Sequence, residues 1–175
     1  IIKATVKMFF QISQDLLPTP VKCHYTFNLR DPAKMVQGVL MVNVKLSLRN
    51  TKDLLNLYLH EMCRQFRDRL VDDTDREWFN TILSQALNSQ ISGATKPDEF
   101  RDIIFGDFLD RADKPYQYVD NQQRCVDIFN EWLDDYNQTN PTKMDIVFFK
   151  DACFHVARCT RTIRQPRGNM LQVGV

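Results

Sequence analysis

Apolar residues recur every three to four positions along most of this chain, and this spacing constrains its fold more than any other feature. The first pattern runs from Ile2 to Leu17, where Pro18 and Pro20 stop it. Spacing of this kind places apolar side chains on one face of a helix. Similar patterns cover residues 32–40, 55–70, 78–87, 97–113, 125–133 and 148–163. With only 5 Gly and 7 Pro in 175 residues, a β-sandwich or barrel is disfavoured, and the sequence predicts a mainly α fold.

The composition argues against nucleic acid and membrane as partners. The chain is 43% hydrophobic and 26% charged, as in ordinary globular domains. Its 23 basic and 22 acidic residues leave a formal net charge of +1, which attracts neither polyanions nor anionic lipid. No apolar run is long enough to span a bilayer. The 5 Cys are odd in number and form no C-x-x-C pair, so we expect reduced thiols in the cytoplasm.

Three helix starts are predicted from capping residues. Asp31 is placed to cap a helix that has Pro32 in its first turn. Thr51 is expected to cap the helix that runs to residue 70. Thr74 and Glu77 have the spacing of a capping box at the start of the next helix.

The last six residues, 170–175, are predicted to form a buried strand. A strand needs neighbouring strands to pair its backbone groups. We therefore expect the rest of a sheet to follow Val175, and the chain to be a piece of a longer protein. The polar stretch 136–142 is the expected boundary between two structural units.

No arrangement of residues predicts catalysis or metal binding. His60-Glu61 begins like a zinc-protease helix, but Arg64 stands where the second histidine is required. A Ser/His/Asp arrangement and a complete glycine-rich phosphate loop are both missing. Acidic residues at 72–75 and 134–135 are interpreted as helix-end or solvated carboxylates.

Basic residues mark two places of interest. Arg30 is expected just outside a helix N-terminus, where free N–H groups and the helix dipole favour an anion and a guanidinium could add a two-pronged phosphate contact. Arg158, Arg161 and Arg164 have the spacing of a single basic ridge on a helix, which is either solvated or an interface.

Five blocks of sequence, in this order, carry a family resemblance. They are residues 17–40 (beginning LPTPVKCHYTFNLRD), 59–61 (LHE), 66–70 (FRDRL), 72–79 (DDTDREWF) and 144–175 (ending IRQPRGNMLQVGV). These blocks resemble the third and fourth AAA+ modules of dynein heavy chains. The sequence of residues 66–73 is similar to that of axonemal dyneins of the inner-arm type.

The resemblance implies a division of the chain between two modules. Residues 1–136 would be the small (lid) domain of the third AAA+ module with its helical extension, and residues 137–175 the N-terminal approach to the fourth module. The implied fold is mainly α, a helical AAA+ lid bundle followed by helices and the first strand of the next AAA+ α/β core.

The implied function is that of one part of an ATP-driven microtubule motor, coupling nucleotide state between adjacent AAA+ modules. The intact motor would use ATP and ADP with Mg. The segment alone would be inactive, because the lysine of the phosphate loop and the catalytic carboxylates are missing. Expected partners are the neighbouring modules of the same heavy chain, microtubules and dynein subunits, in the cytoskeleton of a cilium or flagellum axoneme.

The resemblance also assigns site residues. Arg30 matches the sensor-2 arginine, which reaches the γ-phosphate region of the nucleotide held by its own module. Pro32 departs from the family, which more often has an apolar residue there. Ile146 and Val147 match an apolar segment that flanks adenine in the fourth module, with core packing as the alternative. Gly174 would be the first glycine of the phosphate loop.

A second hypothesis is a free-standing helical scaffold without ATPase activity. Such a module would bind a protein partner through the ridge formed by Arg158, Arg161 and Arg164.

Overall fold

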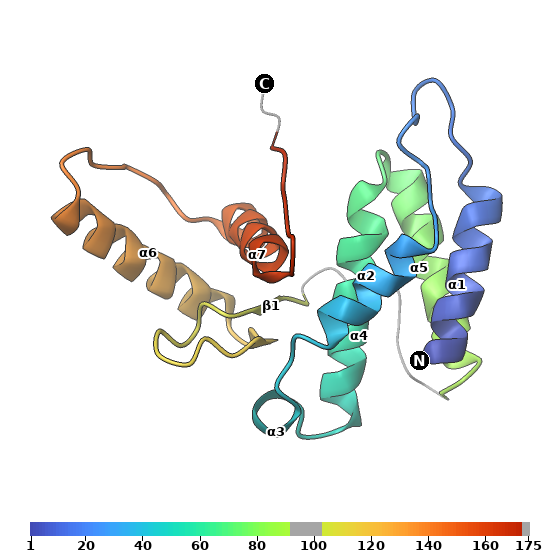
Figure 1. The fold of residues 1–175 in the computed structure, drawn as a ribbon, viewed down its shortest axis with the longest axis horizontal. Helices are drawn as coiled ribbons and strands as arrows, with labels where there is room; N and C mark the ends of the chain where they lie inside the picture. Colours follow the sequence, from blue (N-terminus) through green and yellow to red (C-terminus); the bar gives the residue numbers. More distant parts are fainter. Residues whose placement is uncertain (92–102, 173–175) are drawn as a thin grey trace. The chain divides into compact units, whose positions relative to one another are not determined.

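The structure, a computed structural model, describes residues 1–91 and 103–172 (Figure 1). Within these residues it has seven α-helices, one 3-10 helix and a two-stranded sheet. The helices are α1 (Ile2–Asp15), α2 (Arg30–Val39), α3 (Val44–Ser47), α4 (Thr51–Gln65), η1 (Arg67–Arg69), α5 (Asp73–Asn88), α6 (Gln122–Thr139) and α7 (Lys150–Arg164). The strands are β1 (Phe105–Gly106) and β2 (Gln117–Tyr118). The predicted mainly α class is confirmed.

The chain divides into two compact units. Unit 1 combines Ile1–Leu40 with Leu54–Ile103, and unit 2 combines Met41–Asp53 with Ile104–Val175. These structural units are not the same as the predicted division after residue 136, which assigns residues to two successive AAA+ modules. That division stays a prediction.

Unit 1 is a bundle in which α1 packs against α5 and α2 (Figure 1). The buried face of α1 carries Ala4, Thr5, Met8 and Ile12, which explains the apolar spacing seen in the sequence. Thr5 also donates a hydrogen bond to the hydroxyl of Tyr58, 3.1 Å away on α4. Burial raises the pKa of Tyr58 to about 12.

Unit 2 is built around the contact of α6 with α7 and a short antiparallel ladder. Phe105 pairs with Tyr118, and Gly106 pairs with Gln117. A Cβ atom at Gly106 would lie 2.1 Å from the ring of Phe108, so only glycine fits this close approach. The core of this unit consists of Ile104, Phe108, Val119, Cys125, Phe129, Cys153, Phe154 and Ala157.

The caps predicted for α4 and α5 are wrong, and in both cases an Asx residue before the predicted cap takes the role. Asn50, not Thr51, caps α4, because its Oδ1 accepts from the N–H of Asp53 at 2.9 Å. Asp72, not Thr74, caps α5 through the N–H of Asp75 at 2.9 Å. The short Asx side chains suit this geometry better than threonine.

The helix predicted for residues 97–113 is wrong over 103–113, the part that the structure describes. Ile103, Ile104 and Phe105 are buried in succession, with exposed fractions of 7%, 2% and 0%. A short run buried on all sides cannot be assigned to helix or strand from its spacing. Phe105 and Gly106 pair with β2 as a strand, and Ile103 and Ile104 precede that strand without forming a helix.

Three boundaries also differ from the predictions. The helix expected to reach residue 70 ends at Gln65 and is followed by η1. The stretch 136–142 begins as helix, because α6 continues to Thr139. Residues 170–172 belong to no strand, and residues 173–175 lie outside the described residues. No helix in the described part is long and apolar enough to cross a membrane.

Candidate functional site

Arg30 lies inside the first turn of α2 rather than before it. Leu29 already has helical dihedral angles, φ −62° and ψ −13°, so the helical backbone begins before the predicted cap. The residue that caps this helix is Asn28, whose Oδ1 accepts from the N–H of Arg30 at 2.9 Å. Asp31 completes a reciprocal capping box, because its Oδ2 accepts from the N–H of Asn28 at 2.8 Å. The prediction that Asp31 is the cap was therefore wrong.

Pro32 fits this arrangement because it has no N–H group. In a regular helix the N–H of residue 32 would bond to the carbonyl of Asn28. That carbonyl instead accepts from the N–H of Asp31 at 2.9 Å. The departure from the family pattern at Pro32 is thus compatible with a helix that begins before Arg30.

The side chain of Arg30 is exposed and makes no hydrogen bond or ion pair with any residue that the structure describes. Together with Phe9, Asn28 and Leu29 it lines an open depression on unit 1. Leu29 beside it is 76% exposed. The N–H groups of Arg30 and Asp31 are already bonded to Asn28, so the exposed guanidinium, which has no acidic partner among the described residues, is the group suited to an anionic ligand.

The carboxylate of Asp31 is almost buried and ties the start of α2 to the end of α4. Asp31 is 7% exposed. Its Oδ1 accepts from Nη1 of Arg69 at 2.9 Å and from Nε2 of Gln65 at 3.0 Å. The nearest neighbour of Arg30 in the sequence therefore has a fixed position.

A second cluster anchors the segment that leads into α2. Lys22 Nζ lies 2.7 Å from Asp72 and 2.5 Å from Asp75, at the start of α5. The hydroxyl of Tyr25 donates to Asp75 at 2.6 Å and accepts from the N–H of Val71 at 2.9 Å. Hydrogen bonds with the two carboxylates raise the pKa of Lys22, and the Lys22 hydrogen bond lowers the pKa of Asp72. Burial, followed by the Asp75 contact, raises the pKa of Tyr25.

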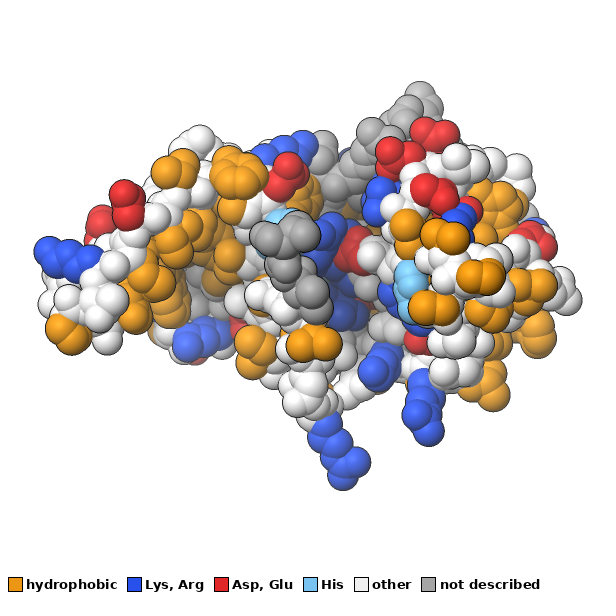
Figure 2. Space-filling model, turned by 90° about the horizontal axis from the view of Figure 1, so that it is seen from above, with side chains coloured by type: hydrophobic (Ala, Val, Ile, Leu, Met, Phe, Trp, Pro, Cys, Tyr) orange, Lys and Arg blue, Asp and Glu red, His pale blue; other side chains and the backbone are white. Residues whose placement is uncertain are grey.

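Ile146 and Val147 lie in the extended segment between α6 and α7, and neither is in the core. Their exposed fractions are 42% and 77%. Ile146 lines an apolar groove of ≈ 650 Å³ in unit 2 together with residues of α6 and α7, whereas Val147 does not line it. Figure 2 shows hydrophobic side chains gathered over this part of the molecule, on the left of the view. Gly174 lies outside the described residues.

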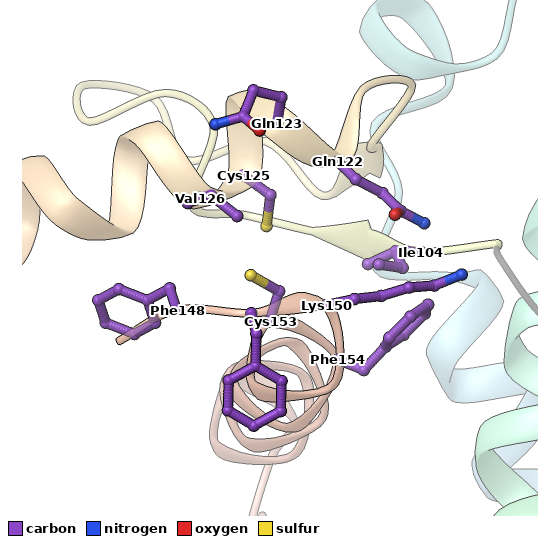
Figure 3. Close-up of a pocket in the computed structure, with 10 residues that line it drawn as sticks. Ile104, Gln122, Gln123, Cys125, Val126, Phe148, Lys150, Cys153 and Phe154 are labelled. Carbon is purple, nitrogen blue, oxygen red and sulfur yellow. The ribbon is translucent and has the colours of Figure 1, made fainter. Parts of the chain in front are cut away.

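A smaller pocket of ≈ 280 Å³ in unit 2 contains a pair of thiols (Figure 3). The sulfur atoms of Cys125 on α6 and Cys153 on α7 point toward each other. Burial raises the pKa of Cys125 to about 12 and raises that of Cys153 as well. Neutral buried thiols of this kind are poor nucleophiles. All 5 cysteines of the chain are free.

The basic ridge predicted on α7 does not form. Arg161 is buried, with an exposed fraction of 7%. Arg164 makes an ion pair with Asp107 at 2.7 Å and donates to the carbonyl of Lys114 at 3.0 Å. Arg161 is therefore hidden from solvent, and Arg164 is held by contacts within unit 2. This removes the surface on which the scaffold hypothesis depended.

His60 and Glu61 are both buried, and the ring of His60 places Nδ1 2.9 Å from the carbonyl of Ile103. Across residues 1–91 and 103–172, no group of three or more His, Cys, Asp or Glu side chains could hold a metal ion.

Two family models match this chain. The model of the AAA+ lid domain matches residues 1–101, which is more than half of the chain. The chain belongs to the AAA+ lid domain family. The model of the P-loop containing dynein motor region D4 matches residues 144–175.

The similar proteins are axonemal dynein heavy chains. The whole chain is 40% identical to human dynein axonemal heavy chain 1 and 42% identical to human dynein axonemal heavy chain 6. Human dynein axonemal heavy chain 2 is 39% identical over 99% of the chain. In each case the chain spans 4% of the length of the relative. The predicted axonemal dynein resemblance is confirmed, whereas the inner-arm assignment stays a prediction.

The site residues fall in both matched regions. Arg30, its capping box and the Asp31 contacts lie within the AAA+ lid match. Ile146, Val147 and Gly174 lie within the match to motor region D4. Sequence reasoning pointed to Arg30 but missed Gln65 and Arg69, which hold its neighbour. Arg69 lies in block 66–70, which carries the family resemblance, whereas Gln65 lies outside every such block.

Proposed function

We propose that this chain is part of the ATP-driven microtubule motor of an axonemal dynein heavy chain, where it couples nucleotide state between adjacent AAA+ modules. One observation carries the proposal: the similarity to axonemal dynein heavy chains, at 40% and 42% identity, extends over 100% of the chain. A match confined to a generic helical region would not support a specific motor.

We assign residues 1–136 to the lid of the third AAA+ module with its helical extension, and residues 137–175 to the approach and first strand of the fourth. The order of the two family matches supports this assignment, because the AAA+ lid precedes motor region D4 along the chain. A lid immediately before the fourth module belongs to the third.

Within this lid, Arg30 is proposed as the sensor of nucleotide bound by the third module. The intact motor would supply ATP or ADP with Mg, and the nucleotide would provide the phosphate charge that this site recognises. Arg30 fits such a ligand because its guanidinium is exposed beside a helix start and has no acidic partner among the described residues. Its role would be to bind and orient a phosphate, not to transfer it.

Ile146 and Val147 are proposed to contact the adenine held by the fourth module. Their exposed fractions of 42% and 77% leave apolar surface that a flat base can cover. The proposed partners are the adjoining AAA+ modules, and through the intact motor microtubules and dynein subunits, in the axoneme of a cilium or flagellum.

The test of this function is Arg30→Ala in the intact heavy chain. Loss of a guanidinium contact to phosphate is expected to weaken the response to nucleotide, seen as a lower microtubule-stimulated ATPase rate and slower microtubule gliding. The matched control is Lys34→Ala, which removes one exposed positive charge from the same helix. ATPase and gliding unchanged by Arg30→Ala, or equally reduced by Lys34→Ala, would refute the sensor assignment.

A further inference from the structure

The side chain of Arg69 contacts several groups around the candidate sensor, Arg30. It lies at the end of η1 and is 38 residues away from Asp31 in the sequence. Its Nη1 donates to Asp31 at 2.9 Å, while its Nη2 lies 3.1 Å from the carbonyl oxygen of His24 and 3.3 Å from that of Thr26. Its guanidinium also lies over the ring of Phe27, 4.5 Å from the centroid. One side chain thus holds the segment before α2 and the first turn of α2 together.

The backbone of Arg69 adds a contact in the same direction. A ring nitrogen of His24 lies 2.9 Å from the carbonyl oxygen of Arg69. Both the main chain and the side chain of Arg69 are therefore bound to the segment that enters α2. This double attachment leaves little freedom for the segment to move relative to η1.

These contacts determine where Arg30 can reach. Arg30 stands between Asn28 and Asp31, the two partners of the capping box, and its own N–H is bonded to Asn28. Its side chain makes no hydrogen bond or ion pair with the described residues that would orient it. The direction in which it leaves the helix is therefore set by the backbone, and Asp31 fixes that backbone through Arg69 and Gln65.

We propose that Arg69 is a positioning residue for Arg30, and that it transmits the position of the α4–η1 turn to the nucleotide sensor through the carboxylate of Asp31. This inference rests on the proposed function, because it assumes that Arg30 responds to nucleotide. Lysine cannot replace Arg69, since a single ammonium group cannot reproduce the planar fork that contacts Asp31 and two carbonyl oxygens at once.

The proposal is tested in the intact heavy chain with Arg69→Lys, Arg30→Ala and the double variant. Microtubule-stimulated ATPase is measured over a titration of ATP, so that kcat and KM are obtained separately. Misplacing a contact group by about 1 Å costs on the order of 10-fold to 100-fold. We expect Arg69→Lys to impair the same kinetic parameter as Arg30→Ala, either a lower kcat or a higher KM, by roughly 10-fold.

The double variant separates positioning from a general structural role. If Arg69 acts through Arg30, the double variant is no worse than Arg30→Ala alone, because the group being positioned is already gone. If Arg69 merely supports the fold, the two losses multiply, to about 100-fold when each is about 10-fold. Multiplying losses would overturn the proposal, as would an unchanged kcat and KM in Arg69→Lys.

Two further variants serve as a control arginine and as a second test of the Arg69–Asp31 contact. Arg76→Lys changes an arginine that pairs with Asp73 at 2.9 Å at the start of α5, and it should leave both kinetic parameters within about twofold of the parent. Asp31→Asn preserves size but removes the charge that Arg69 binds, so it should show the same kinetic defect as Arg69→Lys. It serves as the test variant if Arg69→Lys folds poorly. Limited proteolysis of the heavy chain reports folding of each variant.

The two proposals fail in different ways. If kcat and KM are unchanged in Arg30→Ala, Arg30 does not sense nucleotide, and both the proposed sensor role and this inference are refuted. A reduced rate in Arg30→Ala with normal kinetics in both Arg69→Lys and Asp31→Asn refutes the positioning role alone.

Discussion

Replacing Tyr25 with phenylalanine removes one oxygen atom that takes part in two hydrogen bonds. The hydroxyl donates to Asp75 at 2.6 Å and accepts from the N–H of Val71 at 2.9 Å. The side chain is 2% exposed, so water cannot replace both contacts without rearrangement. These bonds attach the segment before α2 to the start of α5, which makes Tyr25→Phe a direct test of how that segment is held.

The expected cost follows from the two partners. A hydrogen bond to a charged group contributes about 1.5–3 kcal/mol, and one between neutral groups about 1 kcal/mol. Asp75 keeps Lys22 at 2.5 Å, and Val71 is 48% exposed and can bond to water, so both losses are partly compensated. We therefore expect Tyr25→Phe to lower the free energy of unfolding of unit 1 by about 2 kcal/mol. For a unit of this size that corresponds to a fall in Tm of roughly 8–16 °C.

The assay is urea unfolding followed by tryptophan fluorescence. The chain has 2 Trp, so Trp132→Phe in unit 2 leaves Trp78 on α5 as the reporter of unit 1. The matched control is Tyr58→Phe, which removes a buried hydroxyl from the same unit. Among the described residues its hydrogen-bond partner is the neutral hydroxyl of Thr5, at 3.1 Å, and the expected cost is about 1 kcal/mol. The reasoning is refuted if Tyr25→Phe costs no more than Tyr58→Phe.

Three further predictions concern Phe129 and Cys125 in unit 2. Phe129 is 6% exposed, and its ring centroid lies 4.8 Å from that of Phe108 and 5.4 Å from that of Phe148, so Phe129→Ala should destabilise this unit by about 3–5 kcal/mol. Urea unfolding followed by Trp132 would contradict this if the loss were below about 1 kcal/mol. At pH 8, iodoacetamide should modify the exposed Cys23 well before Cys125, as measured by peptide mass spectrometry, and equal rates would disprove the burial of Cys125. Because burial raises the pKa of Cys125 from 9.0 to about 12, the unfolded thiol loses its proton first. The stability that Cys125 contributes below pH 9 should therefore disappear between pH 9 and about pH 12, and Cys125→Ala should flatten this part of the pH dependence of the urea midpoint.

The sequence by itself determined the class of fold and the family. Apolar spacing identified α1, α5, α6 and α7 because one face of each helix is buried, and the burial of residues such as Met8 and Ile12 follows that spacing. The five blocks of resemblance led to the dynein heavy chains before any geometry was known. Arg30 was likewise singled out from its place beside a helix start.

Only the tertiary structure decided which polar groups meet. Asp31 was expected to cap its own helix, but Arg69, 38 residues away, takes one of its oxygens, and Asn28 becomes the cap. Asp72 displaces Thr74 as the cap of α5, and it also binds Lys22 from a distant segment. Spacing along a chain reports which face of an element is buried, whereas a hydrogen bond or ion pair between distant residues depends on how the elements pack. For this reason the positions around Arg30 could be found only after the bundle had brought them together.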